Sequence, residues 1–224
     1  RRGKPAAHKK FGNSIAVLVG DFLLARALSI SAATGRVKVV GILAELTENM
    51  SQGEVHQLMR KGDIGLSEDE YLEVIRRKTA VLFEAACRVS AVLADAPEDK
   101  ESALADYGFN LGMAFQMADD LFDYLLETPQ LGKEIGADLR EGKMTLPLIH
   151  ALRNARAADR KWMAGVIQNK DFSSEDFQKL AGLLTGYGAF RYTEKAAAMF
   201  IEKAKAALEA FGPSETRQTM LDIA

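Results

Sequence analysis

The chain has 224 residues, of which 48% are hydrophobic, and its 29 basic and 31 acidic side chains leave a net charge of -2. This balance of charge argues against a nucleic-acid-binding surface, and the single cysteine excludes an internal disulfide and fits a reducing compartment such as the cytoplasm. No uninterrupted apolar run reaches the ~18 residues that a membrane span requires, because Asp21 and Arg26 interrupt the longest candidate.

Helical periodicity runs through the whole chain, and the alternation that is typical of strands is scarce. Good helix formers such as alanine, leucine and glutamate are abundant. The predicted helices, in chain order, cover residues 12–33, 37–60, 68–94, 99–127, 145–155, 158–168, 174–186 and 188–211. Because no repeat or linker divides them, we expect a single all-α domain over residues 1–224.

Local signals mark several of these boundaries. Ser67 followed by Glu70 predicts a capping box at the start of the third helix. Thr145 followed by Pro147 predicts an N-cap with proline in the first turn. The one long irregular stretch is 128–143, and loops of this length inside compact domains are often functional.

An acidic cluster precedes that loop. An α-helix advances about 100° per residue, so Gln116, Asp119, Asp120 and Asp123 share an arc roughly 100° wide. Three carboxylates are tolerable on one face if cations neutralise them, and Mg²⁺ takes oxygen ligands that it shares with substrate phosphates. The alternative is a solvated acidic helix end. Apolar residues flank the acids and favour a metal site.

Two further charged residues lie on apolar helices. Lys78 falls within the predicted apolar stripe of the third helix, and such a lysine needs a negative partner. That partner is either a structural carboxylate, which the residue taken alone favours, or a bound anion, to which Thr79 could add a hydroxyl. The apolar stripe of the third helix comprises Tyr71, Val74, Ile75, Leu82, Ala85, Ala86, Val89 and Leu93.

Asp21 is an acid on the apolar predicted helix 12–33. We slightly favour a buried, hydrogen-bonded residue over one that faces the same cavity as the acidic cluster.

A basic group completes the pattern. Lys133 and Lys143 bracket the loop after the aspartates, and Arg1 and Arg2 open the chain. Phosphates attract both the arginine fork and the lysine point charge. A P-loop is excluded, since Met144 occupies the position that needs serine or threonine and no strand precedes it.

Together these segments resemble one family, the trans-isoprenyl diphosphate synthases, and among them the octaprenyl-type long-chain synthases of bacteria. The similar segments are RRGKPA, FGNSIAVLVGDFLLARA, SQGEVHQL, YLEVIRRKTAVLFEAA, GMAFQMADDLFDY and LGKEIGADLREGKMTLPLI. They follow the family's order across essentially the whole chain. An aspartate-rich motif followed by the last of these blocks is a specific combination, whereas D-D-x-x-D alone is not.

The resemblance implies an all-α bundle around a central cavity and a head-to-tail condensation of isopentenyl diphosphate onto an allylic diphosphate, with geranyl or farnesyl diphosphate as primer. By position, Asp119, Asp120 and Asp123 match the family's second aspartate-rich motif and would bind Mg²⁺. Family members are homodimers, so the resemblance implies a homodimer here.

The resemblance also implies roles for the remaining polar residues. Lys78, Lys133 and Lys143 would reach the allylic diphosphate, and Thr79 and Gln116 would lie near the developing allylic cation.

At the start of the chain, Arg1 would contact the allylic diphosphate and Arg2 the isopentenyl diphosphate. The family's first aspartate-rich motif lies just upstream of the position of Arg1, and this sequence does not contain it. We therefore expect the natural protein to be longer, with N-terminal helices that are missing here, and the 224-residue piece alone to be inactive.

Two other functions fit parts of the pattern. A class I terpene cyclase or head-to-head synthase shares the metal chemistry, but the LGKEIGADLREGKMTLPLI block argues against it. A non-catalytic regulatory subunit of a prenyl synthase suits the missing first motif, but leaves the intact second motif and its lysines unexplained. Product chain length depends in this family largely on residues upstream of the first motif, so the sequence leaves it open.

Overall fold

The computed structural model describes residues 5–125, 136–169 and 171–224, and helices are the only regular structure among them. This confirms the all-α prediction. The helices are α1 (Ala7–Phe11), α2 (Asn13–Ala33), α3 (Val37–Met59), α4 (Glu68–Ile75), α5 (Val81–Leu93), α6 (Glu98–Leu125), α7 (Ala137–Arg140), α8 (Leu146–Asn154), α9 (Ala157–Gln168), α10 (Ser174–Gly186), α11 (Ala189–Ala207) and α12 (Glu215–Ile223). A π-helical turn (Arg76–Ala80) joins α4 to α5, and a 3₁₀ turn (Leu208–Ala210) follows α11.

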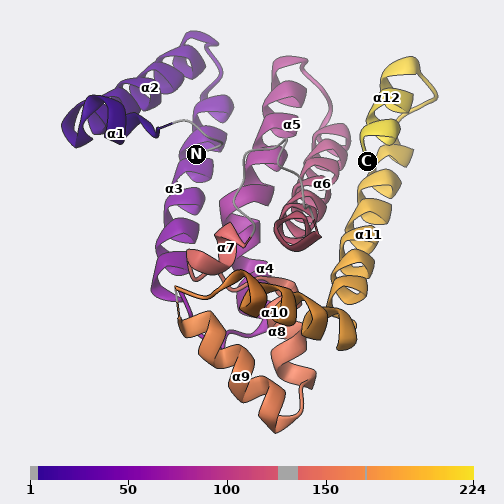
Figure 1. Ribbon diagram of the computed structural model, residues 1–224. Coiled ribbons are helices and arrows are strands. Elements are labelled where there is room, and N and C mark those ends of the chain that lie inside the picture. The colour runs from indigo at the N-terminus through magenta and orange to yellow at the C-terminus, as the bar shows by residue number, and fades with distance from the viewer. Residues whose placement is uncertain (1–4, 126–135, 170) are drawn as a thin grey trace.

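The long helices form one layer in which α5 packs between α3 and α6, and α6 packs against α11 on its other side (Figure 1). The shorter helices α8, α9 and α10 gather at one end of that layer. Helix α8 contacts α6 and α11 of this layer and also α4, so the end group is anchored to the layer at these three elements. Its fully buried residues Leu146, Leu148 and Ala151 lie in the largest hydrophobic core cluster.

The predicted helix boundaries agree with the structure to within a few residues, apart from three short helices and the two special turns. The Ser67 capping box is confirmed: its hydroxyl accepts a hydrogen bond from the Glu70 amide at 3.2 Å, and the Glu70 carboxylate accepts one from the Ser67 amide at 3.0 Å. A second capping box, between Ser173 and Asp176, was not predicted. It has aspartate where the usual pattern has glutamate or glutamine.

The π-helical turn changes the face that α5 presents. Relative to Tyr71, a continuous α-helix would place Lys78 about 20° away and Thr79 about 80° away. The wider turn accommodates one extra residue, so Thr79 takes the direction that Lys78 would otherwise have. The predicted stripe therefore holds through Ile75 and again at Ala85, which is 5% exposed, but it is wrong at Leu82 and Leu93, which are 46% and 48% exposed.

Glycines bring two neighbouring helices close to this turn. A Cβ atom at Gly112 of α6 would lie 2.7 Å from the Ala80 Cα atom, and one at Gly53 of α3 would lie 2.8 Å from the Arg77 Cβ atom. Both distances are shorter than a carbon–carbon contact allows. The π turn is therefore held between α3 and α6 at nearly backbone-to-backbone range.

Helix α2 presents an apolar surface that the other described elements leave uncovered. It packs against α1 and α3, yet Leu18 is 66% and Phe22 65% exposed. By length and composition alone α2 could cross a membrane, although the sequence analysis expected no span. Asp21 is also exposed, so the expectation of a buried, hydrogen-bonded residue is wrong for the chain as described.

Substitution of Gly112 by alanine tests the close approach of α6 to the π turn. The added methyl group meets backbone atoms of Ala80, which cannot rotate away. We expect a loss of about 1–3 kcal/mol in the free energy of unfolding, measured by denaturant titration. Gly182→Ala in α10 is the control, because nothing lies within 4 Å of the added atom and alanine is the better helix former. An equal loss in both variants would contradict this packing.

Candidate active site

The three predicted acidic residues lie near the C-terminal end of α6. Asp120 is fully buried, Asp123 is 5% exposed and Asp119 is half-buried. Two of the three are therefore buried, which a solvated acidic helix end would not give. A buried carboxylate has a large desolvation cost unless charges and hydrogen bonds compensate for it.

Asp120 receives that compensation from three donors. Gln116 Nε2 donates to Oδ1 at 2.9 Å, and Lys143 Nζ donates to the same oxygen at 2.7 Å. Tyr71 OH donates to Oδ2 at 2.8 Å. Burial raises the pKa of Asp120, while Lys143, Gln116 and Tyr71 oppose the increase because each of them stabilises the ionised form. All three contacts suit a carboxylate rather than a carboxylic acid.

Lys143 is the cation of this cluster. Its ammonium group lies 2.7 Å from Asp120 Oδ1 and 3.0 Å from Asp138 Oδ2, and its side chain is 14% exposed. Burial alone would lower the pKa of Lys143, but attraction to Asp120 and Asp138 outweighs burial and raises the pKa above its ordinary value. Lys143 is therefore a permanent positive charge beside the acids.

The segment after the loop folds back onto the end of α6. The Asp138 amide donates to Asp123 Oδ2 at 3.1 Å, just after Gly136 turns the chain with a φ of 74°. Tyr124 OH and Thr145 Oγ1, both buried, lie 2.9 Å apart. Thr145 is the N-cap residue of α8 as predicted, but its side chain caps no amide, because its hydroxyl pairs with Tyr124 instead.

Gln116 connects the acids to the π turn. Thr79 Oγ1 donates to Gln116 Oε1 at 2.7 Å, which leaves the amide nitrogen to donate to Asp120 at 2.9 Å and, more weakly, to Asp119 at 3.4 Å. The structure thus brings together Thr79, Gln116 and the acidic cluster, which are far apart in sequence. The extra residue in the π turn is what points Thr79 at α6.

Lys78 points to the other neighbour of the π turn, α3. Its ammonium group lies 2.8 Å from Glu54 Oε2 and donates to Gln57 Oε1. The Lys78 side chain is 37% exposed and that of Glu54 is 51% exposed. This is an ion pair in contact with solvent, so Lys78 does not neutralise a buried acid among the described residues.

Three of the predicted site residues, Arg1, Arg2 and Lys133, lie outside the described residues. Sequence reasoning missed two others, Tyr71 and Asp138, as partners of the cluster. The signal for Asp138 was its place in the GADLREGK block. The signal for Tyr71 was its place on the predicted apolar stripe that also included Lys78.

The cluster fits a hard cation that is shared with a ligand. Its donors are carboxylate oxygens, which Mg²⁺ prefers, but among residues 5–125, 136–169 and 171–224 no three acidic, histidine or cysteine groups converge to enclose a metal ion. Mg²⁺ is usually held by one or two carboxylates together with water and substrate phosphates. The donor set therefore suits a cation held between protein and phosphate rather than in a cage made by the protein alone.

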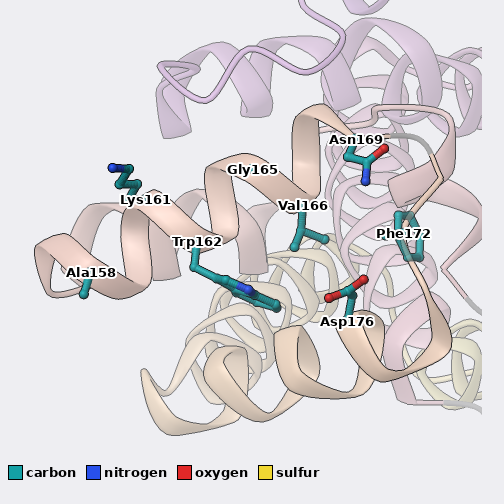
Figure 2. Close-up of a pocket in the computed structure, with 8 residues that line it drawn as sticks. All are labelled: Ala158, Lys161, Trp162, Gly165, Val166, Asn169, Phe172 and Asp176. Atoms are coloured by element: carbon teal, nitrogen blue, oxygen red, sulfur yellow. The ribbon is translucent and has the colours of Figure 1, made fainter.

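A separate pocket lies between α9 and α10, with a volume of about 430 Å³ (Figure 2). Trp162, Val166 and Phe172 supply its apolar walls, and Asp176 lies at its edge. None of the predicted site residues lines it.

Comparison with known proteins identifies relatives along the entire chain. The sequence profile described as polyprenyl synthetase matches residues 1–184. The octaprenyl diphosphate synthases of Haemophilus influenzae and Escherichia coli are 39% and 38% identical over 224 residues, which are 100% of this chain and 68% and 69% of those proteins.

Solved structures give the same result. The decaprenyl diphosphate synthase from Rhodobacter capsulatus is 40% identical with a TM-score of 0.93, over 100% of this chain and 69% of that one. The polyprenyl synthase from Caulobacter crescentus CB15, complexed with calcium and isoprenyl diphosphate, is 43% identical with a TM-score of 0.93, over 100% of this chain and 68% of that one. The chain belongs to the polyprenyl synthetase family.

Proposed function

We propose that this protein is a long-chain polyprenyl diphosphate synthase, which condenses isopentenyl diphosphate head-to-tail onto an allylic diphosphate and releases an all-trans polyprenyl diphosphate. The observation that carries the proposal is one hydrogen-bonded network, in which Lys143, Asp120, Gln116 and Thr79 join a cation, an acidic cluster and neutral oxygen atoms. A diphosphate leaving group would be stabilised by the lysine and by metal ions that the acidic cluster holds. The neutral oxygen atoms would stabilise an allylic cation. The octaprenyl relatives support the long-chain class.

Asp119, Asp120 and Asp123 would hold Mg²⁺ in this protein. When bound, Mg²⁺ would supply positive charge against the departing diphosphate. The Caulobacter neighbour, which is complexed with calcium and isoprenyl diphosphate, supports a site for a hard divalent cation beside a diphosphate. The carboxylates would attach the cations, and Lys143 beside them adds a fixed positive charge of the chain's own.

The chain's own residues orient the allylic substrate. Lys143 is held in place by Asp120 and Asp138, so it offers a preorganised charge to one end of the diphosphate. Lys78 is held only by a solvent-exposed ion pair and can exchange Glu54 for a phosphate oxygen at little cost. We assign Lys133 and Arg1 to the same diphosphate and Arg2 to isopentenyl diphosphate, by position in the family motif.

Thr79 and Gln116 would lie beside the carbon that becomes cationic. The Gln116 amide nitrogen donates to Asp120, so the amide oxygen faces Thr79 and accepts its hydrogen bond. The amide group cannot turn its nitrogen toward the cationic carbon without breaking the hydrogen bonds to the acids. The proton lost in the final step goes, in this proposal, to the departing diphosphate, which is the strongest base left near the product.

The alternative functions gain no support from the relatives. The octaprenyl and decaprenyl synthases are named for elongated chains, and neither a cyclase nor a regulatory subunit stands among the relatives described above. The deciding experiment is a product assay on the full-length protein with isopentenyl diphosphate and farnesyl diphosphate. A cyclic or head-to-head product would refute the proposal.

We also propose that the protein is a cytoplasmic homodimer with a single domain per chain. The uncovered apolar side chains of α2 support an interface there, since exposed patches of this kind mark association surfaces. Light scattering of the full-length protein should give twice the mass of one chain, and a monomeric mass at micromolar concentration would contradict the homodimer.

Removal of Asp119 tests the metal site. In the full-length protein we expect Asp119→Ala to lower turnover by about 10²–10³-fold, because one preorganised electrostatic contact is lost. The helical circular-dichroism signal should be unchanged. Asp106→Ala, an exposed acid on the same helix, is the control and should keep full activity. Chelator should abolish wild-type activity and Mg²⁺ should restore it; full turnover in chelator would refute the metal assignment.

Lys78→Met separates substrate binding from stability. The pair with Glu54 is partly exposed, and such pairs contribute about 0–1 kcal/mol, so the melting temperature should change little. Affinity for a non-ionising allylic diphosphate analogue should fall clearly, because a charge-assisted contact to phosphate is lost. Lys195→Met, an exposed lysine on α11, should change neither quantity. A large fall in melting temperature with unaltered affinity would assign Lys78 to the scaffold.

A further inference from the structure

The carboxylate of Asp120 is held from two sides by different parts of the chain. Its Oδ1 atom accepts hydrogen bonds from Gln116 and Lys143, on α6 and on the segment before α8. Its Oδ2 atom accepts one from Tyr71 OH at 2.8 Å, and within the described part of the chain no other hydrogen bond to that atom is found. Tyr71 is 2% exposed and Asp120 is fully buried, so water does not replace this donor.

The π turn sets the register between Tyr71 and Thr79. Tyr71 lies on α4 and Thr79 lies in the turn itself, and the extra residue between them brings both side chains to the face toward α6. Thr79 donates to Gln116, Gln116 donates to Asp120, and Tyr71 donates to Asp120 from the other end. A chain of three hydrogen bonds thus runs from the π turn through α6 to α4.

These hydrogen bonds matter for Asp120 because the terminal torsion of an aspartate side chain is soft. The χ2 angle of aspartate is broad and nearly two-fold, so backbone position alone does not fix the plane of the carboxylate group. Rotation about the Cβ–Cγ bond moves both oxygens together, and the two donors on Oδ1 restrain that rotation from one end of the group only. The Tyr71 hydroxyl fixes the second oxygen and so determines the direction in which the remaining lone pairs point.

We propose that Tyr71 is a positioning residue of the active site: its hydroxyl group orients the Asp120 carboxylate so that the acidic cluster binds a divalent cation together with the allylic diphosphate. The inference rests on the proposed function and adds a residue that touches neither substrate nor cation. Partners that orient metal-binding groups in this way typically change metal affinity or activity by 10–100-fold when they are removed.

The test compares Tyr71→Phe with Tyr192→Phe in the full-length protein. Both changes delete one hydroxyl group that donates to a carboxylate; Tyr192 OH donates to Glu68 at 2.7 Å and 2.8 Å, on a contact between α11 and α4 away from the acidic cluster. Each ring stays in place, so each variant keeps its packing. Calorimetry measures the dissociation constant of a non-ionising allylic diphosphate analogue, with Mg²⁺ and with chelator.

We expect Tyr71→Phe to weaken Mg²⁺-dependent binding of the analogue by about 10–100-fold. Binding in chelator should change little, since the lysines remain. Tyr192→Phe should match wild type in both conditions. In turnover assays the Mg²⁺ concentration for half-maximal rate should rise for Tyr71→Phe, and kcat should recover largely at high Mg²⁺. A merely structural tyrosine would lower the melting temperature without shifting the Mg²⁺ dependence.

A double-mutant cycle tests whether Tyr71 acts through Asp120. If Tyr71 acts through Asp120, adding Tyr71→Phe to Asp120→Asn should cause little further loss of Mg²⁺-dependent affinity, and equal, additive losses would overturn the inference. So would an unchanged Mg²⁺-dependent affinity in Tyr71→Phe. The wild-type titration judges the proposed function separately: without Mg²⁺-dependent binding by wild type, the proposed function fails, whereas wild-type binding that Tyr71→Phe leaves intact refutes the role of Tyr71 alone.

Discussion

The burial of one negative charge organises this part of the molecule. Asp120 lies fully out of solvent, and an ionised carboxylate in such a place is tolerated only with several donors and a cation. Those donors come from three separate places, Tyr71 on α4, Gln116 on α6 and Lys143 before α8. Each of these segments is therefore tied to the same point, and the end group of helices is joined to the long-helix layer around it.

The π-helical turn is the second constraint, because it points the adjacent residues Lys78 and Thr79 toward two different neighbouring helices. Thr79 joins the network on α6, while Lys78 joins Glu54 on α3. The glycines that face the turn, Gly53 and Gly112, let both helices approach close enough for these side chains to reach. A π turn costs hydrogen-bond geometry relative to an α-helix, and such turns occur frequently at functional sites. Here its effect is a specific rotation of the polar groups.

Two lysines of the proposed site are prepared in different ways. Lys143 is largely shielded from solvent and doubly paired, so its position is fixed before any ligand binds. Lys78 is half-exposed and its partner more so, so its charge can be redirected. A reaction that first binds a diphosphate and then releases it uses both kinds of charge. The fixed charge of Lys143 lowers the reorganisation needed during ionisation, and the redirectable charge of Lys78 adapts to a ligand that changes.

The sequence by itself determined the helices, the acidic face and the family. Helix boundaries follow from local propensity, capping residues and 3.6-residue periodicity, all of which act within a few residues. Asp119, Asp120 and Asp123 were identified as a group for the same reason, since their spacing places them on one turn of a helix. The resemblance rested on motif order, which is also a property of the sequence.

Only the tertiary structure decided which polar groups meet. The stripe that included Lys78 assumed a continuous α-helix, and the π turn, stabilised by close contact with α3 and α6, rotated Thr79 into its place. Tyr71 became a partner of Asp120 across 49 residues of sequence, and the Asp138 amide became a partner of Asp123 across 15. Such pairings depend on how helices pack against one another, and periodicity within one helix carries no information about that packing.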